Sequence, residues 1–108
     1  MDVNLMLKAL SDDNRMKIVE ILLRHNMCVR SLANKLGITQ AAVSQHIRVL
    51  REAGLVSGEK RGYFMHYEVD RAALKALANH LTTLAQVKKG GEHSCHSGCK
   101  CHENKEEI

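Results

Sequence analysis

LANKLGITQAAVSQHIRVLREAGLV, residues 32–56, is the stretch that decides the fold of this chain. It has the pattern of a short helix, a glycine turn and a second, amphipathic helix. Gly37 suits the left-handed residue that ends a helix, and Thr39 is a residue type that caps the next one. Ile38 and Val43 have the spacing of a hydrophobic staple, which fixes how the chain enters the second helix. The stretch therefore predicts two helices that meet at a defined crossing.

The second helix of this stretch has one apolar and one polar face. Val43, Ile47 and Leu50 recur at i, i+4 and i+7, so they form its buried stripe. The polar side carries residue types that bind nucleic acids, because Gln and Arg make bidentate bonds to base edges and Ser binds bases or phosphate. The predicted DNA-binding residues here are Gln40, Ser44, Gln45 and Arg48, with Arg51 on or near the solvent side and His46 at the exposed edge. An amphipathic surface helix whose polar residues are merely solvated is the alternative.

Past Gly54 the hydrophobic period changes from that of a helix to that of a strand. Residues 58–70, GEKRGYFMHYEVD, alternate in the way that predicts a β-hairpin. All three aromatic residues of the chain lie in this segment, and we expect them to pin the hairpin to the helices as part of the core. Lys60 and Arg61 are placed at the tip beside Gly62, where basic side chains reach phosphate. A solvated loop tip is the alternative for this pair.

These segments together resemble the ArsR/SmtB family of bacterial and archaeal winged-helix repressors. The resemblance covers residues 3–87 and rests on LSDDNRMKIVEILL, on SQHIRVLREAGLV from Ser44, and on the hairpin YFMHYEV. It implies a winged helix-turn-helix fold, mainly α with a small β-hairpin. It also implies a homodimer that binds double-stranded operator DNA and leaves it when a metal, a metalloid or a thiol oxidant is sensed.

The composition agrees with a small cytosolic regulator. The chain has 108 residues and a formal net charge of +4, which suits one domain with a polyanionic partner. Residues 88–108 carry equal numbers of acidic and basic side chains, so the basic excess lies in residues 1–87. No apolar run approaches the ~20 residues of a membrane span, and no secretory signal is recognisable. We therefore expect a cytoplasmic protein whose thiols are reduced.

The helices that flank the central stretch predict a dimer. Ser11 is a suitable N-cap for the helix before the central stretch, with Asp12 and Asp13 in its first turn. Apolar residues also recur along the first segment, residues 3–10, and the last segment, residues 74–84. One small domain needs fewer apolar stripes than these, so we expect a homodimer joined through the first and last helices. The alternative is that the last stripe folds back on its own domain.

The end of the chain, residues 88–108, is predicted to be a flexible tail rich in Cys and His, separate from the domain at 1–87. Gly90 and Gly91 are expected to end the preceding helix, and no hydrophobic periodicity follows them. Thiolates and imidazoles are crowded in this tail, and soft thiolates favour zinc, cadmium, copper(I) or a metalloid such as arsenite over magnesium or calcium. The candidate ligands are Cys95, Cys99 and Cys101, with His93, His96 and His102 as weaker ones. A tail without a specific role is the alternative.

The resemblance also bears on which residues would bind an ion. Arsenic-sensing members have a Cys-x-Cys pair before the turn, and the matching positions here are Cys28 and Arg30, so half of that site is missing. Zinc-sensing members use ligands along the last helix, and of those positions only Asp70 matches. A composite site remains, in which Cys28 and the tail thiolates of the same or the partner subunit hold the ion.

Three functions are compatible with these residues. The first is a repressor that releases operator DNA on binding a thiophilic ion, and the second is a thiol redox switch on the same scaffold. The third is a metal-buffering protein whose DNA-like helix is incidental. No paired carboxylates, activated nucleophile or Gly-rich phosphate loop indicates an enzyme. Cys28 itself has a further alternative, that of a small buried hydrophobic residue.

Overall fold

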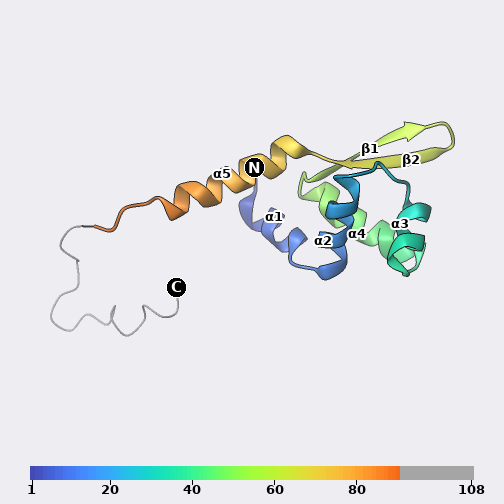
Figure 1. Ribbon diagram of the computed structural model, residues 1–108, viewed down its shortest axis with the longest axis horizontal. Helices are drawn as coiled ribbons and strands as arrows, with labels where there is room; N and C mark the ends of the chain where they lie inside the picture. Colours follow the sequence, from blue (N-terminus) through green and yellow to red (C-terminus); the bar gives the residue numbers. More distant parts are fainter. Residues whose placement is uncertain (91–108) are drawn as a thin grey trace.

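The computed structural model describes residues 1–90, which form five helices and a two-stranded sheet (Figure 1). In chain order the elements are α1 (Val3–Leu10), α2 (Asp13–Leu22), α3 (Val29–Leu36), α4 (Gln40–Glu52), β1 (Val56–Arg61), β2 (Phe64–Val69) and α5 (Arg71–Ala85). This is the predicted mainly α arrangement with a small hairpin. Among the described residues, no helix is both long and apolar enough to cross a membrane.

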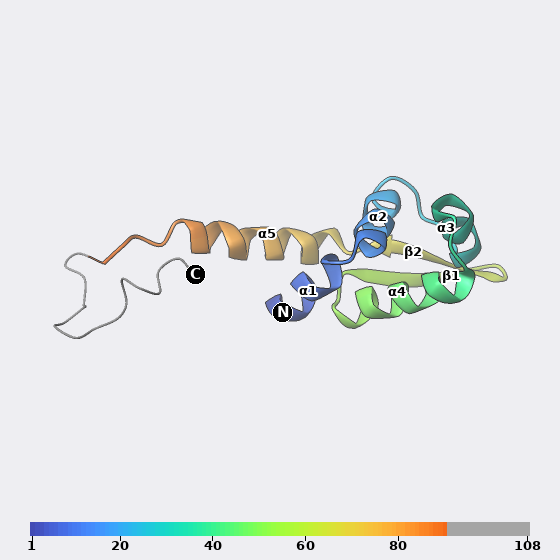
Figure 2. The same cartoon turned by 90° about the horizontal axis from the view of Figure 1, so that it is seen from below.

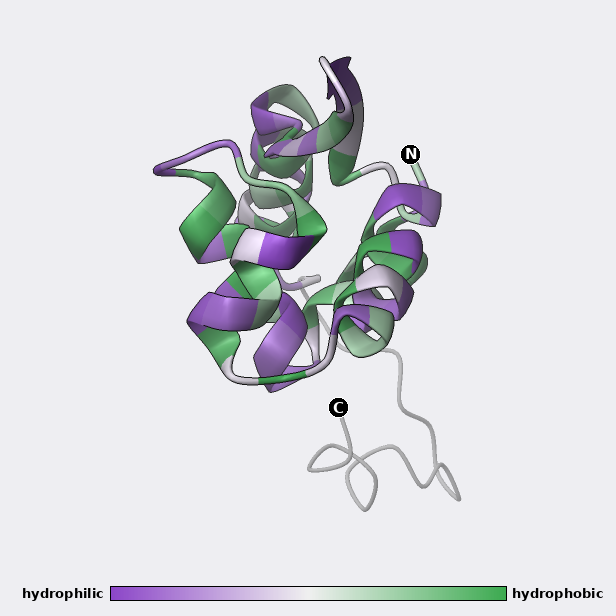
Figure 3. Ribbon diagram, turned by 90° about the vertical axis from the view of Figure 1, so that its right-hand side faces the viewer, coloured by the Kyte–Doolittle hydropathy of each residue, from purple (hydrophilic) through white to green (hydrophobic). Residues whose placement is uncertain are grey.

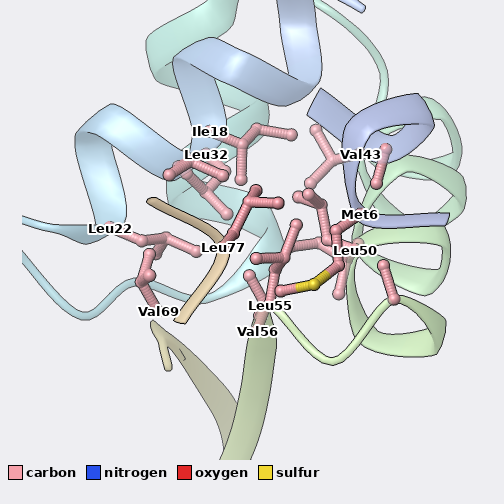
Figure 4. Close-up of a cluster of buried hydrophobic side chains, with 14 of the residues drawn as sticks. Met6, Ile18, Leu22, Leu32, Val43, Leu50, Leu55, Val56, Val69 and Leu77 are labelled. Carbon is pink, nitrogen blue, oxygen red and sulfur yellow. The ribbon is translucent and has the colours of Figure 1, made fainter. Parts of the chain in front are cut away.

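One apolar core joins the helices to the base of the hairpin (Figure 4). Its largest fully buried side chains come from all of the first four helices and from the segment between α4 and β1: Met6, Ile18, Leu32, Val43, Leu50 and Leu55. Burying a side chain of this size contributes roughly 1.5–3 kcal/mol. The helices alternate between hydrophobic and hydrophilic stretches (Figure 3), as expected of helices with one buried face. The core therefore holds α3 and α4 in a fixed relation.

The turn between α3 and α4 has the predicted geometry. Gly37 is left-handed, with φ of 70°, and its N–H donates to the carbonyl of Ala33 at 2.9 Å. The Thr39 hydroxyl accepts from the backbone N–H of Ala42 at 3.0 Å and so caps α4. Ile38 is half-buried and packs against the core that contains Val43, as the predicted staple requires. These local interactions set the direction in which α4 leaves the turn.

The hairpin is antiparallel and in register from Val56 opposite Val69 to Arg61 opposite Phe64. Its base is held by the backbone N–H of Tyr67, which donates to the carbonyl of Met27 at 2.9 Å. The tip projects beyond the helices (Figure 1).

The aromatic residues of the hairpin are not all in the core, as the sequence had led us to expect. Tyr63 is 97% exposed and Phe64 is 53% exposed, and only Tyr67 packs against the core. The reason is the projection of the tip, because the turn at Gly62 and Tyr63 carries these side chains away from the buried core. Tyr63 and Phe64 therefore belong to the surface of the tip.

The corner between α1 and α2 differs in detail from the prediction. Asp12, rather than Ser11, caps α2, and its carboxylate accepts from the N–H of Arg15 at 3.0 Å. Ser11 instead ends α1, and its hydroxyl donates to the carbonyl of Lys8 at 2.7 Å. Ser and Asp are both good N-cap residues, so the sequence did not distinguish the two positions.

Helix α5 begins on the domain and then leaves it (Figures 1 and 2). Its start is held by Arg71, whose side chain donates to the carbonyl of Leu23 at 2.6 Å, and by Leu77, which is buried. Beyond these, Leu81 is 42% exposed and Leu84 is 57% exposed. The helix ends at Ala85, with Gln86 as its C-cap, so the prediction that Gly90 and Gly91 end it was wrong. The exposed half of the apolar seam does not fold back on its own domain.

Candidate nucleic-acid interface

Helix α4 presents the predicted polar face. Gln40, Ser44, Gln45 and Arg48 are all exposed, while the stripe on the other side of the helix is buried in the core. Because these four side chains project from a regular, capped helix, their relative positions are set by the helix geometry. Such a face suits contacts with base edges in a major groove.

His46 does not share this exposed face. Its side chain is only 19% exposed, and Nδ1 lies 3.4 Å from Nη1 of Arg15 and 3.9 Å from a carboxylate oxygen of Asp12. The ring is therefore directed at the start of α2. In a helix, a residue three positions after Val43 lies next to the buried stripe. This spacing was the one sequence signal that could have predicted the partial burial of His46.

A groove of about 460 Å³ lies between α4 and the hairpin, and no sequence pattern had indicated it. Its lining residues are Ser44, Ile47, Arg48, Arg51, Glu52 and Tyr67. The guanidinium carbon of Arg51 stands 5.9 Å from the centre of the Tyr67 ring, within the range of a cation–π contact. The groove borders the polar face of α4 and carries two of its cationic side chains.

The tip of the hairpin carries Lys60 and Arg61, both exposed as predicted. Arg61 is paired with Glu59, with 3.0 Å between Nη2 and the carboxylate oxygen. An exposed pair of this kind contributes at most about 1 kcal/mol, so Arg61 can exchange this partner for a phosphate at little cost.

Cys28 lies at the N-cap of α3 and is half-buried. Its sulfur is 3.5 Å from the hydroxyl oxygen of Ser31, and the hydrogen bonds of Ser31 lower the pKa of the thiol from its ordinary value. A pocket of about 280 Å³ adjoins it, lined by Cys28, Val29, Arg30, Gln40, Tyr63, Phe64 and Met65. Cys28 is thus next to both the first residue of α4 and the tip of the hairpin.

With this geometry in view, known proteins identify the family. The family model described as "Bacterial regulatory protein, arsR family" matches residues 12–57. The HTH-type transcriptional regulator YbzH of Bacillus subtilis is 33% identical over 91 residues, covering 70% of this chain and 91% of YbzH. The chain belongs to the arsR family.

Two further proteins with known roles or structures are similar to this arsR-family chain. A homolog of the cadmium resistance transcriptional regulatory protein CadC, from Staphylococcus aureus, is 38% identical over 78 residues, covering 71% of this chain. The match spans 64% of that protein, less than two thirds of its length. The structure of an ArsR-like transcriptional regulator from Rhodococcus sp. RHA1 aligns with a TM-score of 0.73 at 30% identity, covering 77% of this chain and 78% of that one.

Family and fold together give the class of function. The relatives and the winged helix-turn-helix fold are those of DNA-binding transcriptional regulators, and not of enzymes. The fold that the resemblance implied is therefore confirmed.

The described part of this arsR-family chain does not assemble a metal site by itself. Within residues 1–90, no group of three or more His, Cys, Asp or Glu side chains is arranged to hold an ion. Asp70 caps α5, accepting from the N–H of Ala73 at 3.0 Å, and His80 is an exposed surface residue. The predicted tail ligands His93, Cys95, His96, Cys99, Cys101 and His102 lie outside the described residues. Cys28 therefore remains the one predicted thiolate ligand whose surroundings the structure describes.

Proposed function

We propose that this chain is a homodimeric repressor that binds operator DNA and releases it when cysteine thiolates bind a thiophilic metal or metalloid ion. The observation that carries the proposal is the position of Cys28. It has a thiol whose pKa is lowered, and it lines a pocket together with Gln40 of α4 and Phe64 of the hairpin. A ligand held there would lie against both elements that we assign to DNA binding.

DNA is read by α4 and gripped by the hairpin in this proposal. Four exposed side chains of α4 contact base edges or nearby phosphates in the major groove: Gln40, Ser44, Gln45 and Arg48. Lys60 and Arg61 contact phosphate from the tip of the hairpin. His46 acts indirectly, because its ring contacts Arg15 of α2 and so orients α4 from the side that faces the domain.

The dimer forms through α1 and α5. Leu81 and Leu84 extend the buried seam of α5 into solvent, and Leu5 and Leu7 of α1 are each 39% exposed. A second copy of the chain would bury both sets. Such a dimer sets two α4 helices about 34 Å apart, one turn of DNA, so that both reach the major groove on one side of the duplex.

The ion is held by Cys28 and by ligands from residues 91–108. Cys28 supplies a thiolate, and the tail supplies Cys95, Cys99 and Cys101, with His93, His96 and His102 as weaker candidates. Soft ligands of this kind suit cadmium, zinc or arsenite. The cadmium resistance regulator among the relatives supports the choice of ion class.

Release of DNA follows if the ion binds the DNA-free arrangement better than the bound one. Cys28 lies at the N-cap of α3, the helix before α4, and the tail follows α5, which we place in the dimer interface. An ion bound by both would therefore connect α3 with α5. A coupling free energy of about 1–3 kcal/mol, equivalent to 5- to 150-fold in operator affinity, is ordinary for such linkage.

The test is an operator-binding titration at fixed salt with cadmium, zinc and arsenite in turn. The wild type is compared with Cys28→Ser and with a chain ending at Val87. We expect one of these ions to weaken operator binding by the wild type at least fivefold and to have no effect on either variant. An equal response of all three proteins would show that neither Cys28 nor the tail senses the ion.

A thiol redox switch is the second candidate, favoured by the lowered pKa of Cys28. Thiolates are the form that oxidants attack, so hydrogen peroxide in the absence of metal would release the operator and a thiol reductant would restore binding. The same Cys28→Ser variant would lose this response. The metal-buffering alternative loses its support, because the chain belongs to a family of transcriptional regulators.

A further inference from the structure

Tyr67 forms a fixed platform at the edge of the groove between α4 and β2. Its backbone is held by the hydrogen bond to Met27, and its ring lies against Gly58 on the paired strand. A Cβ atom at Gly58 would come within 2.9 Å of the ring, so the absence of a side chain there makes room for it. The backbone of Tyr67 is therefore held on both sides, by β1 and by Met27, and its ring packs over Gly58.

Arg51 uses this platform. Its guanidinium carbon is 5.9 Å from the centre of the Tyr67 ring, and the side chain lines the groove together with Arg48 and Ser44. These three residues are spaced at i, i+4 and i+7 and share one side of α4. The cation–π contact favours this position of the Arg51 guanidinium before any ligand arrives, which lowers the entropy lost on binding.

The charge of the groove is favourable to an anion. Across residues 1–90, neither Arg48 nor Arg51 has an ion-pair partner, since the two pairs found are His46 with Asp12 and Arg61 with Glu59. Glu52 lines the same groove and offsets one of the two positive charges. One net positive charge and a Ser44 hydroxyl remain, which matches a singly charged phosphodiester.

We propose that this groove binds a backbone phosphate of the operator duplex, with Arg51 as the phosphate ligand and Tyr67 as its positioning residue. The inference rests on the proposed reading of DNA by α4, because a duplex seated on that helix brings a strand past the neighbouring groove. Arginine suits the task, since its planar fork binds phosphate bidentately and stacks on an aromatic ring. The contact fixes the register of α4 on the duplex without reading sequence.

The experiment measures Kd for the operator and for an unrelated duplex over a series of salt concentrations. Arg51→Ala is compared with the wild type and with Arg24→Ala, which removes an exposed arginine just after α2. We expect Arg51→Ala to weaken both duplexes by a similar factor, about tenfold, and to reduce the salt slope by about one per protomer. Arg24→Ala is expected to change neither quantity, and urea unfolding checks that each variant is folded.

Tyr67 is tested by a conservative pair. Tyr67→Phe retains the ring and is expected to bind both duplexes like the wild type, whereas Tyr67→Leu removes the platform and weakens both. Arg51→Lys retains the charge but loses the fork, so its salt slope should stay near that of the wild type while its affinity falls. Equal affinities of Tyr67→Phe and Tyr67→Leu would contradict the positioning role.

Three outcomes would overturn the proposal. An unchanged salt slope in a folded Arg51→Ala variant would show that Arg51 does not contact phosphate. A loss of affinity for the operator alone would show that Arg51 contacts bases. A free anion is the ligand if inorganic phosphate binds the wild type but not Arg51→Ala while the two proteins bind both duplexes with the same affinity and salt slope. Simultaneous replacement of Ser44, Gln45 and Arg48 by alanine separates the two proposals. If that variant loses sequence selectivity while Arg51→Ala binds both duplexes like the wild type, the proposal for Arg51 is wrong and the proposed reading of DNA by α4 stands.

Discussion

Nη1 of Arg15 lies 3.4 Å from Nδ1 of His46, and this contact joins the start of α2 to the middle of α4. The same guanidinium also holds the end of α1, with Nε 2.7 Å from the carbonyl of Ala9. Asp12 completes the junction, because its carboxylate caps α2 and lies 3.9 Å from the imidazole. The hydrogen bond from the N–H of Arg15 is the main cause of the lowered pKa of Asp12. One arginine therefore connects α1, which we place in the dimer interface, with the helix that we assign to DNA.

Replacing Arg15 tests this junction. Arg15→Ala removes the charged donor to Ala9 and to His46, and hydrogen bonds of that kind contribute about 1.5–3 kcal/mol. We expect the free energy of unfolding, measured in urea, to decrease by an amount in that range. Operator affinity should decrease as well. The control is Arg24→Ala, which should leave both unchanged. A wild-type unfolding curve for Arg15→Ala would show that the junction contributes nothing to stability.

Two isosteric variants distinguish the orienting role of His46 from direct contact with DNA. Asn at this position places a polar atom near that of Nδ1, whereas Gln reaches the place of Nε2. If His46 acts by contacting Arg15, His46→Asn retains most of the stability and operator affinity, and His46→Gln loses about 1 kcal/mol in urea unfolding. The opposite order in a binding assay would indicate that Nε2 contacts the duplex.

The exposed end of α5 predicts the behaviour of dimer variants. Leu84→Glu puts a charge where we expect the second copy to pack, so sedimentation equilibrium should show monomers and operator affinity should fall by tenfold or more, on the order of a lost half-site. Asn79→Glu adds the same charge to another side of the helix and should remain dimeric. Leu77→Ala, by contrast, creates a cavity in the core and should cost about 2–5 kcal/mol of stability. Persistence of the dimer in Leu84→Glu would place the interface elsewhere.

Cys28 should titrate below an ordinary cysteine. Hydrogen bonds from Ser31 favour the thiolate, so the pKa of the thiol is lowered and the thiolate fraction rises at a lower pH. The rate of alkylation by iodoacetamide against pH measures this, in a chain where Cys95, Cys99 and Cys101 are all replaced by Ser. Adding Ser31→Ala should move the midpoint upward. Identical midpoints with and without Ser31 would assign the pKa to another cause.

Local sequence signals predicted the helix-turn-helix because its geometry is itself local. Gly37 and Thr39 fix the turn through their own backbone and side chain, and the period of the apolar residues separates the two faces of α4. The position of Leu84 on the apolar side of α5 likewise follows from helical spacing, whereas its exposure follows from the way that α5 leaves the domain. What failed depended on distant residues. His46 is held by Arg15, 31 positions earlier in the chain, and the exposure of Tyr63 depends on where the hairpin projects.

The groove between α4 and the hairpin shows the same limit. The sequence placed Arg51 near the solvent side of α4 but gave no indication of its partner, because the ring of Tyr67 reaches it from another element. The register that sets Gly58 opposite Tyr67 arises from strand pairing and not from the period of either strand. For the tail cysteines, predicted from the density of ligands alone, the composite site with Cys28 stays a prediction.

Gly58 offers a final test of how tightly this groove is built. A Cβ atom there would meet Cε of Met65 at 2.8 Å and Cε1 of Tyr67 at 2.9 Å. Met65 can move its flexible end, but the backbone of Tyr67 is held by its hydrogen bond to Met27, so the Tyr67 ring must turn away from its place beneath Arg51. We expect Gly58→Ala to lower stability by about 1–3 kcal/mol, as overpacking does, and to reduce the salt slope of DNA binding.

The comparison for Gly58→Ala is Gly62→Ala, at the turn of the same hairpin. Gly62 has φ of 63° and open space around it, so alanine there meets no neighbour and suffers only the strain of a left-handed backbone, about 1–2 kcal/mol. Both variants should therefore be less stable in urea, but only Gly58→Ala displaces the platform under Arg51. If the two variants show the same salt slope for an unrelated duplex, the position of the Tyr67 ring does not control the contact of Arg51 with phosphate.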